Sequence, residues 1–144
     1  MKIAVIDGQG GGLGKTVISK LIKEVKNNIY IVAVGTNAIA AEGMLKAGCN
    51  ETLWGEAAIA SYFKENNVDC IIGPIGIICS GAINGEVTPF LANLLFNLKC
   101  TKYLIPLKKH GLYIPGTTSI DLKDLIEEII NDIKAISEKE LKTP

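Results

Sequence analysis

Several short apolar runs in this chain are continuous, without the polar residues that alternate along a half-exposed strand. This pattern constrains the fold more than any other feature. The clearest runs are residues 2–6 (KIAVI), 30–34 (YIVAV), 70–73 (CIIG) and 103–107 (YLIPL). Strands that are apolar on both faces are typical of a parallel sheet that helices cover on each side. The runs therefore predict a parallel sheet at the centre of the molecule.

Apolar residues at helical spacing lie between these runs. One stripe joins Val17, Ile18, Leu21, Ile22 and Val25, and a longer one joins Leu125, Ile126, Ile129, Ile130, Ile133 and Ile136. We expect further helices over 38–47 and 56–66, one that starts at Pro89 after a Thr88 N-cap, and a last one from Asp121.

Strand and helix alternate along the whole chain, which predicts an α/β protein with a three-layer, doubly wound Rossmann-like fold. We expect a mostly parallel sheet of five or six strands in the order 3-2-1-4-5, with residues 111–116 as the sixth strand. The chain has 144 residues, the length of one domain, so residues 1–144 are expected to form a single domain.

Charge and cysteine content narrow the classes of partner. Fifteen lysines balance fifteen acidic residues, which removes the electrostatic basis for binding nucleic acid or an anionic membrane. Because the chain has no arginine, an anion has to be held by backbone amides, hydroxyl groups or lysine. The four cysteines form no CxxC pair, so we expect free thiols, no metal site and a reducing compartment.

Targeting segments are not evident either. The first apolar run reaches an acidic residue too soon for a signal peptide, and the longest uncharged stretch, 70–85, is broken by glycine and proline. We expect a soluble, cytoplasmic protein.

Residues 7–16 read DGQGGGLGKT and directly follow the first apolar run. A glycine-rich turn between a strand and a helix can hold an anion with the unpaired amides and the positive dipole end of that helix. This turn predicts a phosphate site, with cofactor-binding candidates Gly8, Gly10, Gly11, Gly12, Leu13, Gly14 and Lys15.

The spacing of the glycines separates several phosphate-binding classes. The tail of the P-loop pattern GxxxxGK[ST] fits, but its first glycine would fall on Gln9. The stretch is more similar to the variant loop GKGGxGKT of nitrogenase iron protein and cell-division ATPases, with Gln9 in place of the early lysine. No aspartate follows a second strand to position Mg²⁺, which argues against an ATPase.

The dinucleotide pattern GxGxxG fails at Leu13, and the methyltransferase pattern GxGxG fails at Gln9. The variant GxxxGxG, characteristic of short-chain dehydrogenases, matches in full at Gly8, Gly12 and Gly14. The YxxxK of those enzymes is absent, so this resemblance implies cofactor-loop geometry and no chemistry.

Three further stretches belong to the expected ligand-binding edge of the sheet. Thr36 and Asn37 follow the second run, where they would contact a ribose or cap the next helix, and Gly73 and Pro74 follow the third run. The loop 73–89 is long and punctuated by glycine, which favours a functional role. Asp7 is expected to weaken phosphate binding, because its carboxylate would fold back onto the loop amides and compete with the ligand for them.

Two residues are candidates for catalysis. Glu86, whose alternatives are a solvated turn residue or a ribose contact, would act as a general base, and His110 would act as an acid or base. Lys108 and Lys109 are expected to be simply solvated.

The segments MKIAVIDGQGGG, VGTNA, MLKAG, GPIGII, GEVTP and LIPL resemble a family of short bacterial proteins of unknown function, over most of residues 1–107. This resemblance implies a stand-alone Rossmann-like domain and supplies no activity. Our leading hypothesis is a module that binds NAD(P) or another nucleotide and forms a homodimer. The alternatives are a small enzyme acting on a phosphorylated metabolite and a partner-binding domain with an empty loop.

Overall fold

The computed structural model describes residues 1–26, 28–109 and 111–142. Along these residues strands and helices alternate. Their bounds are β1 (Lys2–Asp7), α1 (Gly12–Glu24), β2 (Tyr30–Gly35), α2 (Ala38–Leu45), β3 (Glu51–Trp54), α3 (Glu56–Glu65), β4 (Cys70–Pro74), the 3₁₀ turn η1 (Ile75–Ile78), α4 (Pro89–Phe96), β5 (Thr101–Ile105) and α5 (Leu122–Lys142).

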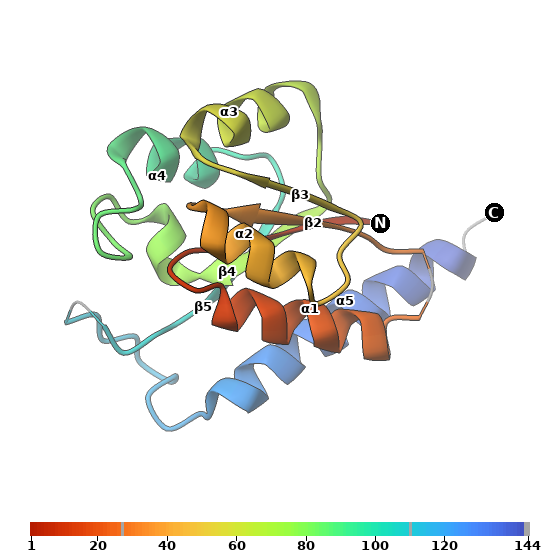
Figure 1. Cartoon of the computed structure of the whole chain (residues 1–144). Coiled ribbons are helices and arrows are strands. Elements are labelled where there is room, and N and C mark those ends of the chain that lie inside the picture. The colour runs from red at the N-terminus through yellow and green to blue at the C-terminus, as the bar shows by residue number, and fades with distance from the viewer. Residues whose placement is uncertain (27, 110, 143–144) are drawn as a thin grey trace.

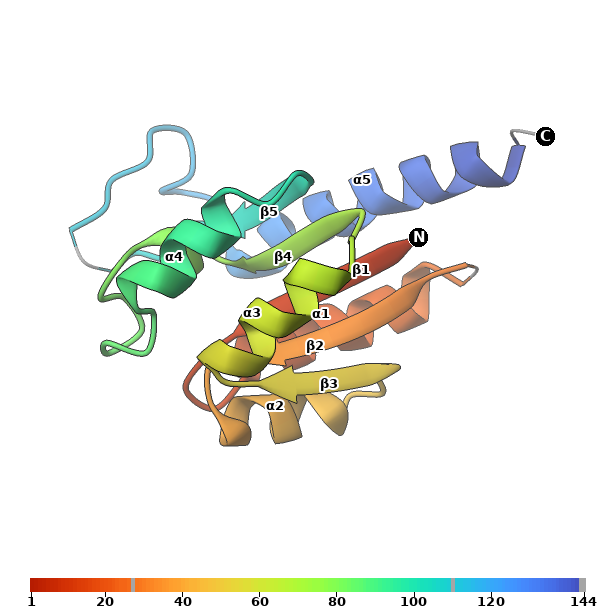
Figure 2. The same ribbon diagram turned by 90° about the horizontal axis from the view of Figure 1, so that it is seen from above.

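The strands of the described residues form one five-stranded, all-parallel sheet in the order β3-β2-β1-β4-β5. Figure 2 shows them side by side in this order. Val5 lies at the centre of the sheet, with Ala33 of β2 on one side and Ile72 of β4 on the other. The predicted fold class and strand order are confirmed.

Helices cover both faces, which is why the central strands are apolar throughout. Alternate residues of β1 separate the two packing layers: Ile3 and Val5 pack with α1, α2 and α5, whereas Ala4 and Ile6 pack with α3 and α4. Figure 1 shows α1 and α5 on one side of the sheet and α3 and α4 on the other. Crossovers on both faces make this a doubly wound sheet.

Two details of the sheet differ from the prediction. Residues 111–116 form turns and not a sixth strand, so that prediction is wrong. The strand β3 was not located from the sequence, because its four residues lie half-exposed at the sheet edge and lack a continuous apolar run. The last strand ends at Ile105, because Pro106 has no N–H to continue the ladder.

The point where strand order reverses lies between β1 and β4, since the chain moves outward from β1 in both directions. In open α/β sheets ligands bind at this position, beyond the carboxyl ends of the strands. The fold therefore predicts a ligand site beside the segments that follow Asp7 and Pro74.

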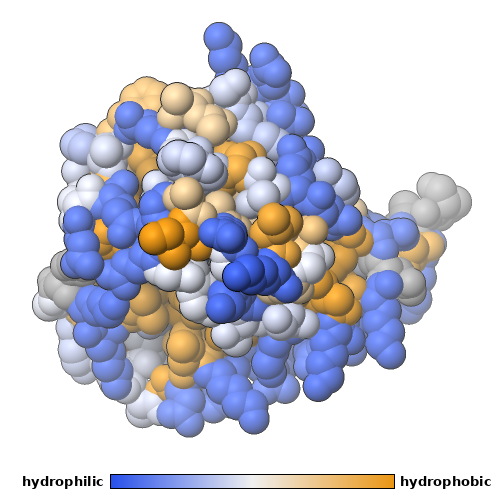
Figure 3. All heavy atoms as spheres, in the orientation of Figure 1, coloured by the Kyte–Doolittle hydropathy of each residue, from blue (hydrophilic) through white to orange (hydrophobic). Residues whose placement is uncertain are grey.

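Figure 3 shows apolar atoms over α1 and α2 as separate patches among hydrophilic residues. The large apolar side chains that are exposed on these two helices are Ile22, Ile39 and Leu45. Isolated patches of this kind are ordinary on a protein surface. Within the described part of the chain, no helix has the length and apolarity needed to cross a membrane.

Candidate functional site

The glycine turn after β1 is organised by Asp7. Its side chain is 7% exposed, and its two oxygens accept hydrogen bonds from the amides of Gly8 and Gly14, each at 2.8 Å. Burial raises the pKa of this carboxyl group, and the amide donors Gly14 and Gly8 offset the rise only in part. The prediction that Asp7 folds back onto the loop is confirmed.

An incoming phosphate would therefore meet a carboxylate at the start of α1. A helix N-terminus stabilises an anion by about 0.3–1 kcal/mol, and by about 2 kcal/mol in sheltered geometry. Two like unit charges about 4 Å apart repel by about 4 kcal/mol at an effective dielectric constant of about 20. The repulsion is the larger effect, so the helix start already holds its anion, the carboxylate of Asp7.

Glu86 joins three segments that are far apart in the sequence. Its Oε1 accepts hydrogen bonds from Thr36 Oγ1 at 2.6 Å, Asn37 Nδ2 at 2.6 Å and the amide of Gln9 at 3.1 Å. Partial burial raises the pKa of Glu86, but these donors outweigh it and lower the pKa below its ordinary value. A carboxylate held in this way is a weak base. Glu86 instead links the glycine turn to the segment after β2, and we call this set of hydrogen bonds to Gln9, Thr36 and Asn37 the bridge.

The bridge covers the end of β2. Asn37 also caps α2, where its side chain accepts a hydrogen bond from the amide of Ala40 at 2.8 Å, as the capping alternative predicted. A Cβ atom added at Gly8 would lie 2.7 Å from both Ile83 Cγ2 and Thr36 Oγ1. The space over Gly8 on the β2 side is therefore filled by the protein itself.

A cavity of about 350 Å³ opens beside this bridge, at the carboxyl ends of β1 and β4 and next to the segment after β5. Its floor and walls come from three stretches. The lining residues are Asp7, Gly8, Gln9, Pro74, Ile75, Gly76, Cys79, Ser80, Gly81, Ala82, Ile83, Asn84, Leu107, Lys109 and Leu112. It lies at the point where the strand order reverses, the expected position for a ligand.

The predicted cofactor-binding residues are distributed unevenly around this cavity. Gly8 and Pro74 line it. Gly10, Gly11, Gly12, Leu13, Gly14 and Lys15 lie in the turn and first helical turn of α1, outside the cavity lining, as do Thr36, Asn37 and Gly73. Ligand binding by these predicted residues remains a prediction, as does catalysis by Glu86. His110 lies outside the described residues.

Glycine at two of these positions has a packing reason. A Cβ atom added at Gly73 would lie 2.6 Å from the carbonyl oxygen of Ile6, so glycine lets β4 approach β1 closely. Gly11 has a φ of 72°, and its added Cβ would lie 2.7 Å from the carbonyl oxygen of Ala40 on α2. These two glycines therefore serve close packing, of β4 against β1 and of the turn against α2.

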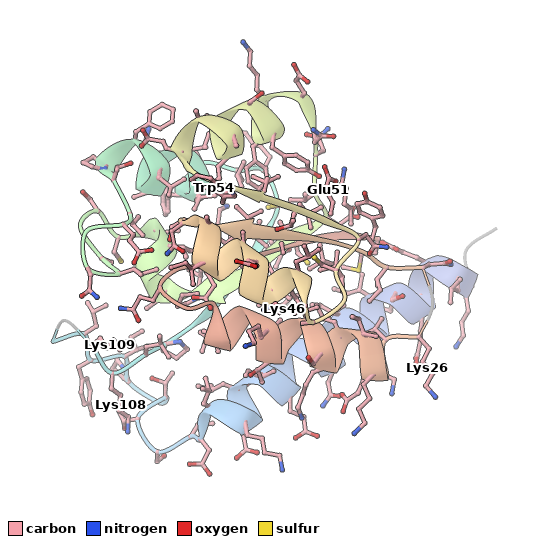
Figure 4. All side chains as sticks on the ribbon, viewed as in Figure 1. Lys26, Lys46, Glu51, Trp54, Lys108 and Lys109 are labelled. Carbon is pink, nitrogen blue, oxygen red and sulfur yellow. The ribbon has the colours of Figure 1, made fainter. Side chains whose placement is uncertain are left out.

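Sequence reasoning located two of the three stretches that form the cavity wall, the glycine turn after β1 and the long loop 73–89. It missed the third stretch, the segment after β5 that contributes Leu107, Lys109 and Leu112, because this segment carries no motif. Among the described lining residues two are charged, the buried Asp7 and the exposed Lys109. Figure 4 shows Lys108 and Lys109 on the segment after β5.

Metal ligands do not gather here. No group of three His, Cys, Asp or Glu side chains with suitable placement occurs in residues 1–26, 28–109 and 111–142.

Comparison with known proteins identifies the family of this chain, a family whose function is unknown. The chain belongs to the family described as a domain of unknown function, DUF3842, whose model matches residues 2–138. No curated protein matches it. The crystal structure of a dodecameric FMN-dependent UbiX-like decarboxylase from Escherichia coli O157:H7 is similar, with a TM-score of 0.51 at 14% identity over 99% of this chain and 96% of that one. This likeness concerns the fold.

Proposed function

We propose that this member of a family of unknown function binds a small molecule of mononucleotide size in the cavity between β1 and β4. The observation that carries the proposal is the position of a largely apolar cavity at the point where the strand order reverses. Ligand sites are typically concave and mostly apolar, with a few placed polar groups. Asp7, Asn84 and Lys109 are such groups in this lining.

Size and shape favour one nucleotide unit over two. The volume of about 350 Å³ is near the lower end of the roughly 300–1,000 Å³ typical of ligand pockets. A dinucleotide would extend across β1 toward β2, where Glu86 already occupies the hydrogen-bonding groups of Thr36 and Asn37. We therefore favour a mononucleotide or flavin over NAD(P).

A flavin is the first ligand to test. The similar fold in the crystal structure from Escherichia coli belongs to an FMN-dependent protein. The apolar walls here, formed by Ile75, Ala82, Ile83, Leu107 and Leu112, suit a planar ring system.

Calorimetric titration with FMN, AMP and NAD tests the proposal directly. We expect FMN or AMP to bind and NAD to bind more weakly or not at all. The variant Ser80→Trp places an indole in the cavity wall and should abolish binding, whereas Ser61→Trp makes the same change at an exposed position of α3 and should not. Binding that survives Ser80→Trp, or its absence for every ligand at millimolar concentration, would contradict the proposal.

We also propose that the protein associates with itself through α4. Phe90 and Phe96 are 56% and 61% exposed on this helix, which carries no charged residue. Asn93 is the one polar side chain of this helix, and a helix that is so largely apolar is normally buried. The similar Escherichia coli protein is a dodecamer, which supports an oligomer without specifying its size.

A further inference from the structure

The two charged residues of the cavity lining differ in depth, and this difference sets a direction for the ligand. Asp7 is nine-tenths buried, and Lys109 is exposed. Building on the proposed function above, we propose that the ligand lies with an uncharged, hydrogen-bond-donating end at Asp7 and its anionic group at the mouth beside Lys109. This orientation is the reverse of one that puts the phosphate in the glycine turn.

The deep end is suited to a donor. Each oxygen of Asp7 accepts one amide hydrogen bond, from Gly8 and from Gly14. An ionised carboxylate has about four acceptor sites, so it can accept further bonds from a ligand. A ring N–H or amino group would be stabilised there, and a phosphate would be repelled by the same charge.

Glu86 adds to this preference for a donor. Its Oε1 lies close enough to the turn to accept the amide of Gln9, and a Cβ atom added at Gly8 would be 3.1 Å from it. The charge of Glu86 also raises the pKa of Asp7, although burial is the larger cause. Two acidic side chains therefore surround the glycine turn on which a phosphate would otherwise lie.

The mouth is suited to an anion. Within residues 1–26, 28–109 and 111–142, Lys109 makes no ion pair with a carboxylate, and the chain has no arginine to hold a phosphate. Asn84, which also lines the cavity and is exposed, can donate a hydrogen bond from its side-chain amide. Between the two ends the lining is mainly apolar, which suits the body of a planar ring.

Three flavins and two lysine variants test this orientation. The dissociation constants of FMN, riboflavin and 3-methylriboflavin are measured by flavin fluorescence for the wild type, Lys109→Gln and Lys108→Gln. Lys108 is the matched control, because it is the neighbouring exposed lysine and does not line the cavity. Riboflavin lacks the phosphate of FMN, and 3-methylriboflavin lacks the ring N–H donor.

We expect the wild type and Lys108→Gln to bind FMN about tenfold more tightly than riboflavin, a preference that Lys109→Gln loses. All three proteins should bind 3-methylriboflavin about tenfold more weakly than riboflavin, because its methyl group meets the buried acceptor. This comparison changes the ligand and leaves Asp7 unaltered. A difference between the dissociation constants of riboflavin and 3-methylriboflavin therefore cannot arise from impaired folding of a variant.

Other outcomes overturn the proposal in distinct ways. An FMN preference that Lys109→Gln retains, and that grows in a folded Asp7→Asn variant, would put the phosphate in the glycine turn. Equal dissociation constants for riboflavin and 3-methylriboflavin would show that the ring N–H does not contact Asp7. If no flavin binds at all, the flavin form of the proposed function fails, and the orientation fails with it.

Discussion

At the scale of single residues, Gly8 shows how a motif glycine can serve packing. A Cβ atom added at this position would lie 2.7 Å from atoms of Ile83 and Thr36, whereas one added at Gly10 would meet nothing within 4 Å. We expect Gly8→Ala to lower the free energy of unfolding by about 1–3 kcal/mol through overpacking. Gly10→Ala should change it by less than about 0.5 kcal/mol. Urea denaturation measures both, and equal effects would show that the loop has room at Gly8.

Glu86 gives a prediction that depends on pH. Its pKa is lowered in the folded state, so its contribution to stability is present above the unfolded-state pKa and is lost as the pH falls through the folded-state value. Glu86→Gln replaces charge-assisted hydrogen bonds from Thr36, Asn37 and Gln9 with weaker ones. We expect a loss of about 1–2 kcal/mol near neutral pH.

This loss should shrink as the pH falls below about 4.3, the ordinary glutamate value. Denaturation of both proteins across this pH range checks the trend, with Glu42→Gln as the control because Glu42 is exposed on α2. A constant difference at all pH values would mean that the ionised form of Glu86 contributes nothing to the bridge.

At the scale of elements, the cap of α4 fixes the end of the loop that forms the cavity wall. Thr88 Oγ1 accepts a hydrogen bond from the amide of Leu91 and donates one to Glu56 of α3. We expect Thr88→Ala to destabilise the protein by about 1 kcal/mol, and Thr88→Ser, which keeps the hydroxyl group, to be close to wild type. Thermal unfolding followed by circular dichroism distinguishes them; identical melting temperatures for Ala and Ser would argue against the cap.

At the scale of the whole molecule, the proposed self-association depends on α4. Phe96→Lys puts a charge on its exposed apolar face, whereas Ile39→Lys makes a comparable change on α2, at a side chain that is 71% exposed. We expect light scattering to find an oligomer for the wild type and for Ile39→Lys, and a monomer for Phe96→Lys, because a buried unpaired charge is costly. A wild-type monomer at micromolar concentration would contradict the proposal.

Much of the architecture follows from local sequence. The runs that became β1, β2 and β4 are apolar on both faces, and this indicates buried parallel strands without further information. Thr88 with Pro89, and Asn37 before α2, are capping residues that act on their own helices. Asp7 could be predicted for the same reason, because it acts on amides one and seven positions away.

The cavity was decided by tertiary structure. Its wall brings together Gln9, Cys79 and Lys109, which lie on three loops, and no spacing in the sequence relates them. Glu86 resembled a candidate base or a turn residue until the fold placed it against donors 49, 50 and 77 positions away. Local sequence determines strands, helices and caps because their hydrogen bonds are short in range. The shape and charge of the ligand site depend on which loops the sheet order brings together.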